Sequence, residues 1–295
     1  MEYMDLYQML WFFLAYSVIG WCIEVVYHAI SMGRVVNRGF LNGPVCPVYG
    51  FGMLCVLTLA DIVRPADGTA LSAPVLFFGG MVLASLVELI AGWLLDVLFH
   101  ARWWDYSGVP FNFHGYICLK FSILWGIGNV YVMKLVHPVL AVVFTGILPR
   151  RTGMVLLAIL YAIYAADTVV TVLIVSGMNK KLEILDDLRL SMRIVSDRMS
   201  EKLGNEAIET VQRIDENRVR AALAKAELKE LVEETKNESL DKLQRRKALL
   251  EEKAESLKKR MMKPQIFGIK RLFRAFPGMK SPGYAEVIAL LKELL

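Results

Sequence analysis

Residues 75–99 read VLFFGGMVLASLVELIAGWLLDVLF, and this stretch decides the fold class. Its only charged side chains are Glu88 and Asp96. A helix needs about 20 mainly apolar residues to cross the ~30 Å hydrocarbon layer of a bilayer. A helix packed in water keeps one polar face, which this stretch lacks. We therefore expect residues 75–99 to form a membrane-spanning helix.

Other stretches of the first 178 residues have the same apolar character. They run over about 6–30, 48–63, 116–136 and 154–175. A shorter one, residues 139–148, follows Pro138 and cannot span alone, so it is either a half-helix or part of a kinked segment. The predicted fold is all-α, with a polytopic membrane domain of five or six helices over residues 1–178, embedded in the lipid bilayer.

Charge divides the chain at the same point. The net charge is −1 through Met178 and +6 beyond it, which together give the +5 of the whole chain. Lysine and arginine in short loops mark the cytoplasmic side of a membrane. Three groups of them lie beside the predicted spans: Arg34 with Arg38, Arg102 with Lys120, and Lys180 with Lys181. Five crossings from an external N-terminus place all three in the cytoplasm, although Arg150 and Arg151 then fall outside. The expected location is the cell membrane, multi-pass, with a cytoplasmic C-terminal tail.

The tail is predicted to be helical and to have two parts. In residues 179–263, leucine and methionine recur at spacings of three and four among many charges, which is typical of coiled-coil helices. Antiparallel pairing within one chain and parallel self-association of two chains both fit this pattern. Residues 264–295 form a basic and aromatic segment with a short terminal helix. That segment either rests on an anionic membrane surface or folds back on the coiled coil.

Carboxyl groups inside the predicted spans are the first candidate functional residues. Glu24 lies in the first span, Glu88 at the middle of the third, and Asp96 two turns after Glu88. A charge at mid-membrane costs about 2.5–3.5 kcal/mol, and such residues usually face a bundle interior or a wet cavity. These carboxyls either hold the bundle together or line a pathway for a substrate or a proton. Both alternatives need them to face inward.

The first predicted loop, NRGFLNGPVCPVYGFG over residues 37–52, combines turn residues with apolar ones. Its predicted structural residues are Asn37, Arg38, Gly39, Gly43, Pro44, Pro47 and Gly50. Phe40 and Leu41 have little reason to lie in a solvated loop. Irregular backbone at membrane depth must be buried in protein or line a cavity. The loop is therefore either partly re-entrant or a tight interfacial turn.

A later loop interleaves aromatic and polar residues over positions 102–116. Tryptophan and tyrosine gather at the headgroup level of a membrane, and this explains the aromatic residues alone. Asp105, Asn112 and His114 are further candidates for a substrate or proton pathway. The alternative is that this cluster binds a lipid phosphate or headgroup.

Three features carry a resemblance to a known family. They are the string NRGFLNGPVCPVYGFG, Glu88 with the following Gly92, and RWWDYSGVPFNFHGYICLKFSILWG at residues 102–126. With them, about residues 3–176 resemble the bacterial membrane family of ABC-transporter permeases of type IV, the CmpB-like family. The resemblance implies a membrane-embedded, permease-like subunit, but no particular substrate. We expect the chain to move or handle a small or lipid-like substrate together with other chains. No G-x-x-x-x-G-K-[ST] motif occurs in the chain, so the ATPase would be a separate subunit.

Other classes of function have less support in the sequence. The four cysteines form no C-x-x-C pair, and no zinc-binding spacing occurs, so we expect neither a metal site nor a cofactor. The charge of the tail is balanced along most of its length, which argues against nucleic-acid binding. We do not expect an enzyme. Two alternatives stay open: an intramembrane enzyme that uses carboxyls and His114 on a lipid-linked substrate, and a scaffold that recruits partners through its tail.

Overall fold

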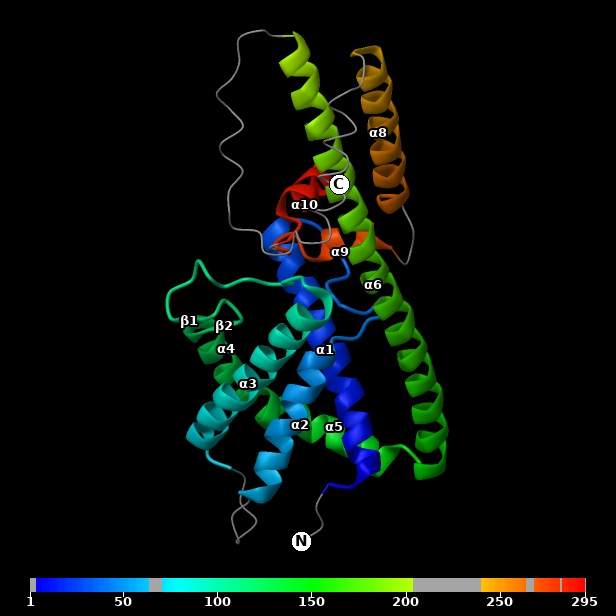
Figure 1. The fold of residues 1–295 in the computed structure, drawn as a ribbon. Coiled ribbons are helices and arrows are strands. Elements are labelled where there is room, and N and C mark those ends of the chain that lie inside the picture. Colours follow the sequence, from blue (N-terminus) through cyan, green and yellow to red (C-terminus); the bar gives the residue numbers. More distant parts are fainter. Residues whose placement is uncertain (1–3, 64–70, 204–239, 264–267, 282, 295) are drawn as a thin grey trace. The chain divides into compact units, whose positions relative to one another are not determined.

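The computed structural model describes residues 4–63, 71–203, 240–263, 268–281 and 283–294 of the chain (Figure 1). The described residues are helical apart from loops and one short hairpin, which confirms the all-α fold class. They divide into two compact units. Unit 1 contains the described parts of residues 1–177 and 264–285, and unit 2 those of residues 178–263 and 286–294.

Unit 1 begins with three apolar helices. They are α1 (Leu6–Met32), α2 (Pro47–Ile62) and α3 (Ala73–Phe99). Asp5 and Gln8 form a reciprocal capping box at the start of α1, and Gly33 ends the helix in the left-handed conformation. Pro47 and Pro74 lie in the first turns of α2 and α3, where no backbone N–H is needed. In the packed unit, α1 contacts α2 and α2 contacts α3.

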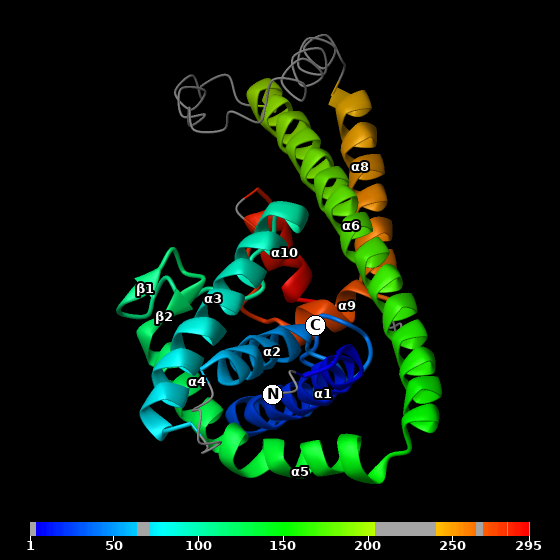
Figure 2. The ribbon, with the colours of Figure 1, turned by 90° about the horizontal axis from the view of Figure 1, so that it is seen from below.

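One helical segment continues from Leu119 to Ile147 and bends on the way (Figures 1 and 2). Its parts are α4 (Leu119–Tyr131), η1 (Val132–Val136), α5 (His137–Ala141) and η2 (Val142–Ile147). The two η parts are π-helical turns, and Pro138 lies between them. Both π-turns and proline are common causes of helix bends. Residues 139–148 are therefore mostly the second half of a kinked segment, not a separate half-helix.

The last span is part of α6 (Arg150–Leu203), a helix of 54 residues that continues from unit 1 into unit 2. Four of the described helical segments are long and apolar enough to cross a membrane. They are α1, α3, the bent segment 119–147 and α6. The apolar helix α2 has only 16 residues. The protein is thus a helical membrane protein, with α2 as the fifth apolar helix.

Aromatic side chains fill the core of unit 1 near the start of α1. Trp11 stacks on Phe144 with 4.6 Å between ring centroids, and Phe12 lies 4.9 Å from the ring of His137. The Tyr16 hydroxyl and Nδ1 of His137 share a hydrogen bond of 2.9 Å. His137 lies in α5 and Phe144 in η2. These two parts of the bent segment therefore pack against the first half of α1.

Two loops of unit 1 hold residues that the sequence singled out. The first loop (residues 33–46) joins α1 to α2, and the second loop (residues 100–118) joins α3 to α4. The second loop contains a hairpin of two short antiparallel strands, β1 (Asn112–Phe113) and β2 (Ile117–Cys118). Together the loops carry most of the polar residues that the sequence singled out.

The C-terminal part of the chain returns to unit 1 and contacts both loops. Helix α9 (Ile269–Ala275) and the turn after it, up to Ser281, make these contacts. Leu272, Phe273 and Met279 are buried. In this part of the predicted segment 264–295, the structure shows contacts with the loops of unit 1, which were not predicted from the sequence. These contacts form because the basic side chains find acceptors among the carbonyls and carboxylates of the loops. Contact with a membrane surface stays a prediction.

Unit 2 contains the tail helices. Residues 178–203 of α6 lie beside α8 (Leu240–Met261), and the two run antiparallel (Figures 1 and 2). Helix α10 (Ala285–Lys292) is joined to α6 by an ion pair between Arg189 and Glu286. This arrangement favours antiparallel pairing within one chain. Residues 204–239 of the predicted coiled coil lie outside the described residues, and self-association stays a prediction.

Candidate functional site

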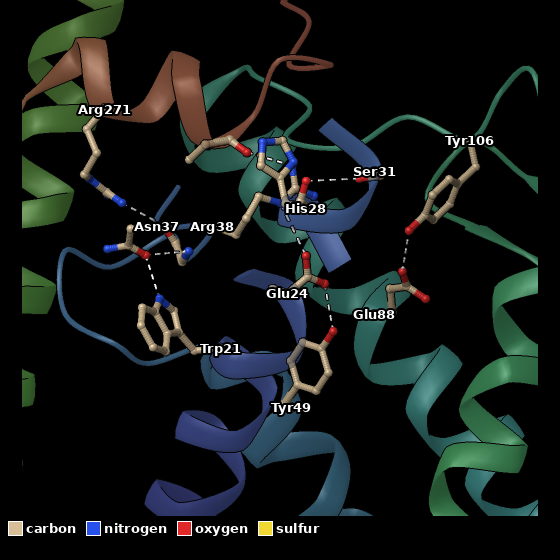
Figure 3. A network of polar contacts seen from close by, with 12 residues as sticks. Trp21, Glu24, His28, Ser31, Asn37, Arg38, Tyr49, Glu88, Tyr106 and Arg271 are labelled. Atoms are coloured by element: carbon tan, nitrogen blue, oxygen red, sulfur yellow. Dashed lines mark hydrogen bonds and ion pairs between the residues drawn. The ribbon is translucent and has the colours of Figure 1, made fainter. Parts of the chain in front are cut away.

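Glu24 of α1 is the first carboxylate of the candidate site, and its two oxygens have different partners (Figure 3). The Tyr49 hydroxyl donates to Oε1 at 2.7 Å, and Nε of Arg38 lies 3.4 Å from Oε2. Gly20 lies one turn before Glu24, and a Cβ there would come within 2.1 Å of the Tyr49 ring. Glycine at this position therefore allows the phenol to reach the carboxylate. Glu24 is held by one neutral donor and one cation.

Glu88 of α3 is the second carboxylate, and only 6% of this residue is exposed. The Tyr106 hydroxyl donates to Oε1 at 3.1 Å (Figure 3), and the Trp125 indole N–H donates to Oε2 at 2.9 Å. Burial, and then the nearby Glu88 carboxylate, raise the pKa of the Tyr106 phenol well above its usual value. The hydroxyl is therefore protonated, and both groups that bind Glu88 are neutral donors.

Two aromatic side chains connect the carboxylates. The rings of Tyr49 and Trp125 meet edge to face with 5.1 Å between their centroids. The Tyr49 hydroxyl binds Glu24, and the Trp125 N–H binds Glu88. We call these four residues, one each from α1, α2, α3 and α4, the carboxylate cluster. Two carboxylates linked in this way inside a helix bundle can take up and release a proton or bind a cation away from water.

Asp96 lies two turns after Glu88 in α3 and belongs to a different group of side chains. Nε of Arg102 lies 3.1 Å from its Oδ2, and the Tyr116 hydroxyl donates to the same oxygen at 2.7 Å. The Arg102 guanidinium also lies 4.9 Å from the Tyr116 ring centroid, a cation–π contact. The hydrogen bond to Asp96, together with burial, raises the pKa of the Tyr116 phenol. Asp96 therefore anchors the second loop.

Asp105 is held by the C-terminal part of the chain. Its Oδ2 accepts from Nζ of Lys280 at 2.7 Å, and its Oδ1 accepts from the backbone N–H of Ser107 at 3.0 Å. The Lys280 bond, more than those from Ser107, lowers the pKa of the Asp105 carboxyl to about 2, against the opposing effect of burial. Asp105 is therefore ionised at neutral pH, and Lys280 neutralises its charge.

Asn112 and His114 shape the hairpin of the second loop. The Asn112 amide donates to the carbonyl of Val109 at 2.8 Å and accepts from the backbone N–H of Gly115 at 3.1 Å. His114 has a left-handed φ of 50° in the turn, and its carbonyl accepts from Arg102 at 3.1 Å. The positions of both residues are accounted for by the shape of the loop, and binding of a lipid headgroup there stays a prediction.

The first loop is tied back on α1. Oδ1 of Asn37 accepts from the Trp21 indole N–H at 2.7 Å (Figure 3) and from the backbone N–H of Gly39 at 2.9 Å. The backbone N–H of Cys46 donates to the carbonyl of Ser17 at 2.9 Å. Ser17 lies 15 residues before the end of α1, about 22 Å along the helix axis. The loop therefore returns beside α1 before α2 begins, which explains the short α2 and favours the re-entrant alternative.

Asp167 of α6 satisfies the irregular backbone of this loop. One carboxylate oxygen accepts from the backbone N–H of Asn42 at 3.1 Å and from its side-chain amide at 2.8 Å. The other oxygen accepts from the backbone N–H of Gly43 at 2.7 Å. Backbone N–H groups away from water need such acceptors, because leaving them unpaired costs free energy. A carboxylate of the last span is thus a structural partner of the first loop.

The remaining residues of the predicted structural loop lie at its second half. Pro44 is exposed, and Pro47 opens α2. Gly50 packs against α1, where a Cβ would come within 2.2 Å of the Ser17 hydroxyl oxygen. Arg38 has a further role, because it contacts both Glu24 and the carbonyl of Ala275.

Of the six predicted pathway residues, the structure brings Glu24 and Glu88 together. Asp105, Asn112 and His114 lie in the second loop, and Asp96 lies in α3, where it binds Arg102 of that loop. Sequence reasoning missed Tyr49, Trp125 and Tyr106 as partners of the carboxylates. One signal was available: a tyrosine or tryptophan inside a buried apolar segment usually finds a hydrogen-bond partner for its O–H or N–H.

Within the part of the chain that the structure describes, no three His, Cys, Asp or Glu side chains are grouped so that they could hold a metal ion. The four cysteines, Cys22, Cys46, Cys55 and Cys118, are free thiols.

The model of a protein family described as "Putative ABC-transporter type IV" matches residues 11–172. These residues run from α1 to the unit 1 part of α6 and include the carboxylate cluster and both loops. No curated protein and no solved structure matches the chain.

Proposed function

Since the chain belongs to the family described as Putative ABC-transporter type IV, we propose that it is the membrane-embedded, permease-like subunit of a transporter. The family match covers more than half of the 295 residues. In this proposal the chain handles a small or lipid-like substrate, and a separate subunit hydrolyses ATP. Purification in mild detergent followed by mass spectrometry of the bound chains would identify that subunit.

The observation that carries the proposal is the environment of Glu88. It lies 15 residues from the start of α3 and 11 from its end, so about 16 Å or more of helix separates it from either end. A carboxylate side chain cannot reach bulk water over that distance. Its two bound groups are neutral donors, which do not compensate a negative charge. Such a carboxylate is suited to bind a proton or a positively charged group of a substrate.

Glu24 supports the same proposal in a different role. Arg38 lies beside Glu24 and compensates its charge. One carboxylate of the cluster is thus occupied by a cation of the protein, and the other is available to a ligand. Glu24 is the second carboxylate of the cluster, and the packed rings of Tyr49 and Trp125 lie between it and Glu88.

The variant Glu88→Gln tests the proposal. Glutamine keeps the size and the hydrogen-bonding ability of the side chain but cannot ionise. We expect the variant to reach normal abundance in the membrane and to fail to complement a strain that lacks the native gene. Abundance is measured by immunoblot and function by growth of the complemented strain.

The matched control is Ser85→Ala in the same helix. Ser85 is also buried, and its hydroxyl donates to Ser122 at 2.7 Å, outside the carboxylate cluster. Its loss should leave growth close to that of the wild type. A fully functional Glu88→Gln protein at normal abundance would rule out the pathway role of this carboxylate and leave it as packing alone.

A further inference from the structure

The C-terminal return of the chain forms a contact region outside the carboxylate cluster. We call residues 268–281, which comprise α9 and the turn after it, the clasp. Arg271 donates from Nη1 to the carbonyl of Gly39 and from Nη2 to the carbonyl of Phe40, both at 2.9 Å. The planar fork of an arginine suits two neighbouring acceptors of this kind. These bonds fix one end of the clasp on the first loop.

The other end of the clasp is fixed on the second loop. Lys280 and Arg102 exchange two backbone hydrogen bonds of 2.7 and 2.9 Å, as opposed residues of antiparallel strands do. The Ser281 hydroxyl donates to the carbonyl of His100 at 2.8 Å. The ion pair between Lys280 and Asp105 adds a side-chain contact to these backbone contacts. The clasp therefore bridges the two loops.

Apolar side chains pack between the two ends. The ring of Phe276 meets Trp103 with 5.0 Å between centroids, and Trp103 meets Phe40 at 5.1 Å. Phe273 and Leu272 of the clasp are almost completely buried. Burial of apolar side chains of this size stabilises the packed arrangement. The clasp is thus a packed part of unit 1.

Arg38 connects the clasp with the carboxylate cluster (Figure 3). Its Nη1 donates to the carbonyl of Ala275 at 2.7 Å, and its guanidinium carbon lies 5.5 Å from the ring centroid of Phe276. On its other side, Nε lies 3.4 Å from Glu24. The shorter contact of Arg38 is with the clasp, so the clasp orients the guanidinium that faces Glu24.

The order of the chain gives the clasp two connections to unit 2. The clasp belongs to unit 1, whereas residues 178–263 before it and residues 286–294 after it belong to unit 2. A partner chain that moves unit 2 would therefore act on the clasp through covalent connections at both of its ends.

We propose that Arg38 is a positioning residue for Glu24, and that the clasp controls it. When the clasp is attached, Arg38 neutralises Glu24. When a movement of unit 2 detaches the clasp, Arg38 leaves, and Glu24 becomes available to a proton or a cation. The inference rests on the proposed function where it assigns Glu24 to a pathway, but the attachment of the clasp and its effect on Arg38 do not.

The first measurement tests attachment in the purified full-length protein. The native cysteines Cys22, Cys46, Cys55 and Cys118 are replaced by alanine. Ala101→Cys then serves as the reporter, because Ala101 is 1% exposed and lies between His100 and Arg102, both bound by the clasp. Removing the two charged hydrogen bonds with Arg271→Ala should speed labelling by a water-soluble maleimide about tenfold or more. Lys270→Ala, which removes a cation from the same helix, is the control and should leave the rate close to that of the parent.

The second measurement tests the effect on Glu24. A hydrophobic carbodiimide modifies protonated carboxyls in membrane proteins, and peptide mass spectrometry reads Glu24 and Glu88 separately. Beside Arg38, Glu24 is expected to be protected from the reagent. Both Arg271→Ala and Arg38→Ala should raise its modification several-fold and leave Glu88 unchanged. Arg38→Lys keeps the charge and should restore most of the protection, which a purely structural role of Arg38 would not require.

The outcomes are separable. Faster labelling at residue 101 with unchanged modification of Glu24 would overturn the positioning role, and no change in either measurement would overturn the clasp itself. If Arg271→Ala does not yield folded protein, Lys280→Ala, which removes only the outer ion pair, undergoes the same two measurements. A functional Glu88→Gln protein would remove the proposed function and leave these two results standing, so the two failures can be told apart.

Discussion

Asp167 provides hydrogen-bond acceptors for backbone N–H groups of the first loop. In a helix or a sheet, backbone carbonyls do this. Asp167 accepts from the backbone of Asn42 and Gly43, and Thr171 of its own helix donates to the same carboxylate at 3.3 Å. A carboxylate of the last span is thereby committed to structure. This separates Asp167 from Glu88, whose partners are neutral side chains of other elements.

We expect Asp167→Ala to destabilise the protein by about 2–4 kcal/mol, because it leaves the backbone N–H groups of Asn42 and Gly43 without their acceptor. The Asn42 amide keeps its bond to the Thr171 hydroxyl. The thermal unfolding temperature of the purified protein in detergent measures this change. Thr145→Ala is the control: this exposed threonine bonds only to the carbonyl of Ala141 in its own helix among the contacts described. Equal unfolding temperatures for Asp167→Ala and the wild type would contradict the structural role.

The intramembrane carboxylates could be predicted from the sequence, whereas their partners could not. Glu24 and Glu88 stand out because they interrupt apolar runs. A charge inside a membrane costs free energy whatever the fold, so such residues can be recognised from sequence alone. The partner of Glu88, Trp125, lies 37 residues away on another helix. No local spacing relates the two, and the pairing depends on how α3 packs on α4. The pairing of Tyr49 with Glu24 could not be predicted for the same reason.

Among the helices, the tail pair in unit 2 makes the clearest prediction. Because residues 178–203 of α6 and α8 lie antiparallel within one chain, a fragment of residues 178–263 should be helical, with a monomeric mass if the pairing within one chain is the whole of the coiled coil (Figure 1). Circular dichroism and sedimentation measure the two properties. Leu243 is fully buried, so Leu243→Asp should lower the helical signal more than the same change at the exposed Leu249.

A dimeric mass for this fragment would mean that the apolar positions also serve a second chain, as parallel self-association requires. A disordered fragment would refute the coiled-coil interpretation of this part of the tail.

Whether the helix breaks or continues at Pro138 could not be predicted from the sequence of the bent segment. Pro138 marks an interruption, because proline has no N–H to donate. The helix nevertheless continues, since the π-turn before the proline lets the N–H of His137 bond to the carbonyl of Val132, five residues back. The contact between the rings of Phe12 and Phe144 then stabilises the bend. Neither the π-turn nor the packing has a signature in local composition, so the sequence could only offer two alternatives.

At the scale of the whole molecule, the charge pattern and the contacts of the clasp predict the same orientation in the membrane. The clasp binds both loops, so both loops lie on the same side of unit 1. These loops carry Arg38 and Arg102, and the positive-inside rule assigns them to the cytoplasm. The contact between the clasp and the first loop joins residues more than 200 positions apart, which is why the sequence revealed the basic character of the segment and not its binding place.

We therefore expect reporter fusions after Met178 and after Leu295 to be cytoplasmic, and a fusion after Pro149 to be external. Alkaline phosphatase, which is active only after export, and green fluorescent protein, which is fluorescent in the cytoplasm, give opposite readings at each position. High phosphatase activity after Met178 or Leu295 would overturn the orientation. The fusion after Pro149 also serves as the control that the reporter can be exported.

Because the clasp belongs to unit 1 but follows the tail helices in the chain, the membrane domain is built out of order during synthesis. The ribosome completes the unit 1 part of α6, which ends at residue 177, and then makes about 90 further residues before it makes the clasp. At about 5–20 residues per second, the two loops wait roughly 5–20 s for their partner. During this time the nascent protein exposes the carbonyls and aromatic rings that the clasp will cover. This surface stays exposed until translation has passed residue 281. A chaperone or protease that binds it would therefore distinguish unfinished chains from complete ones.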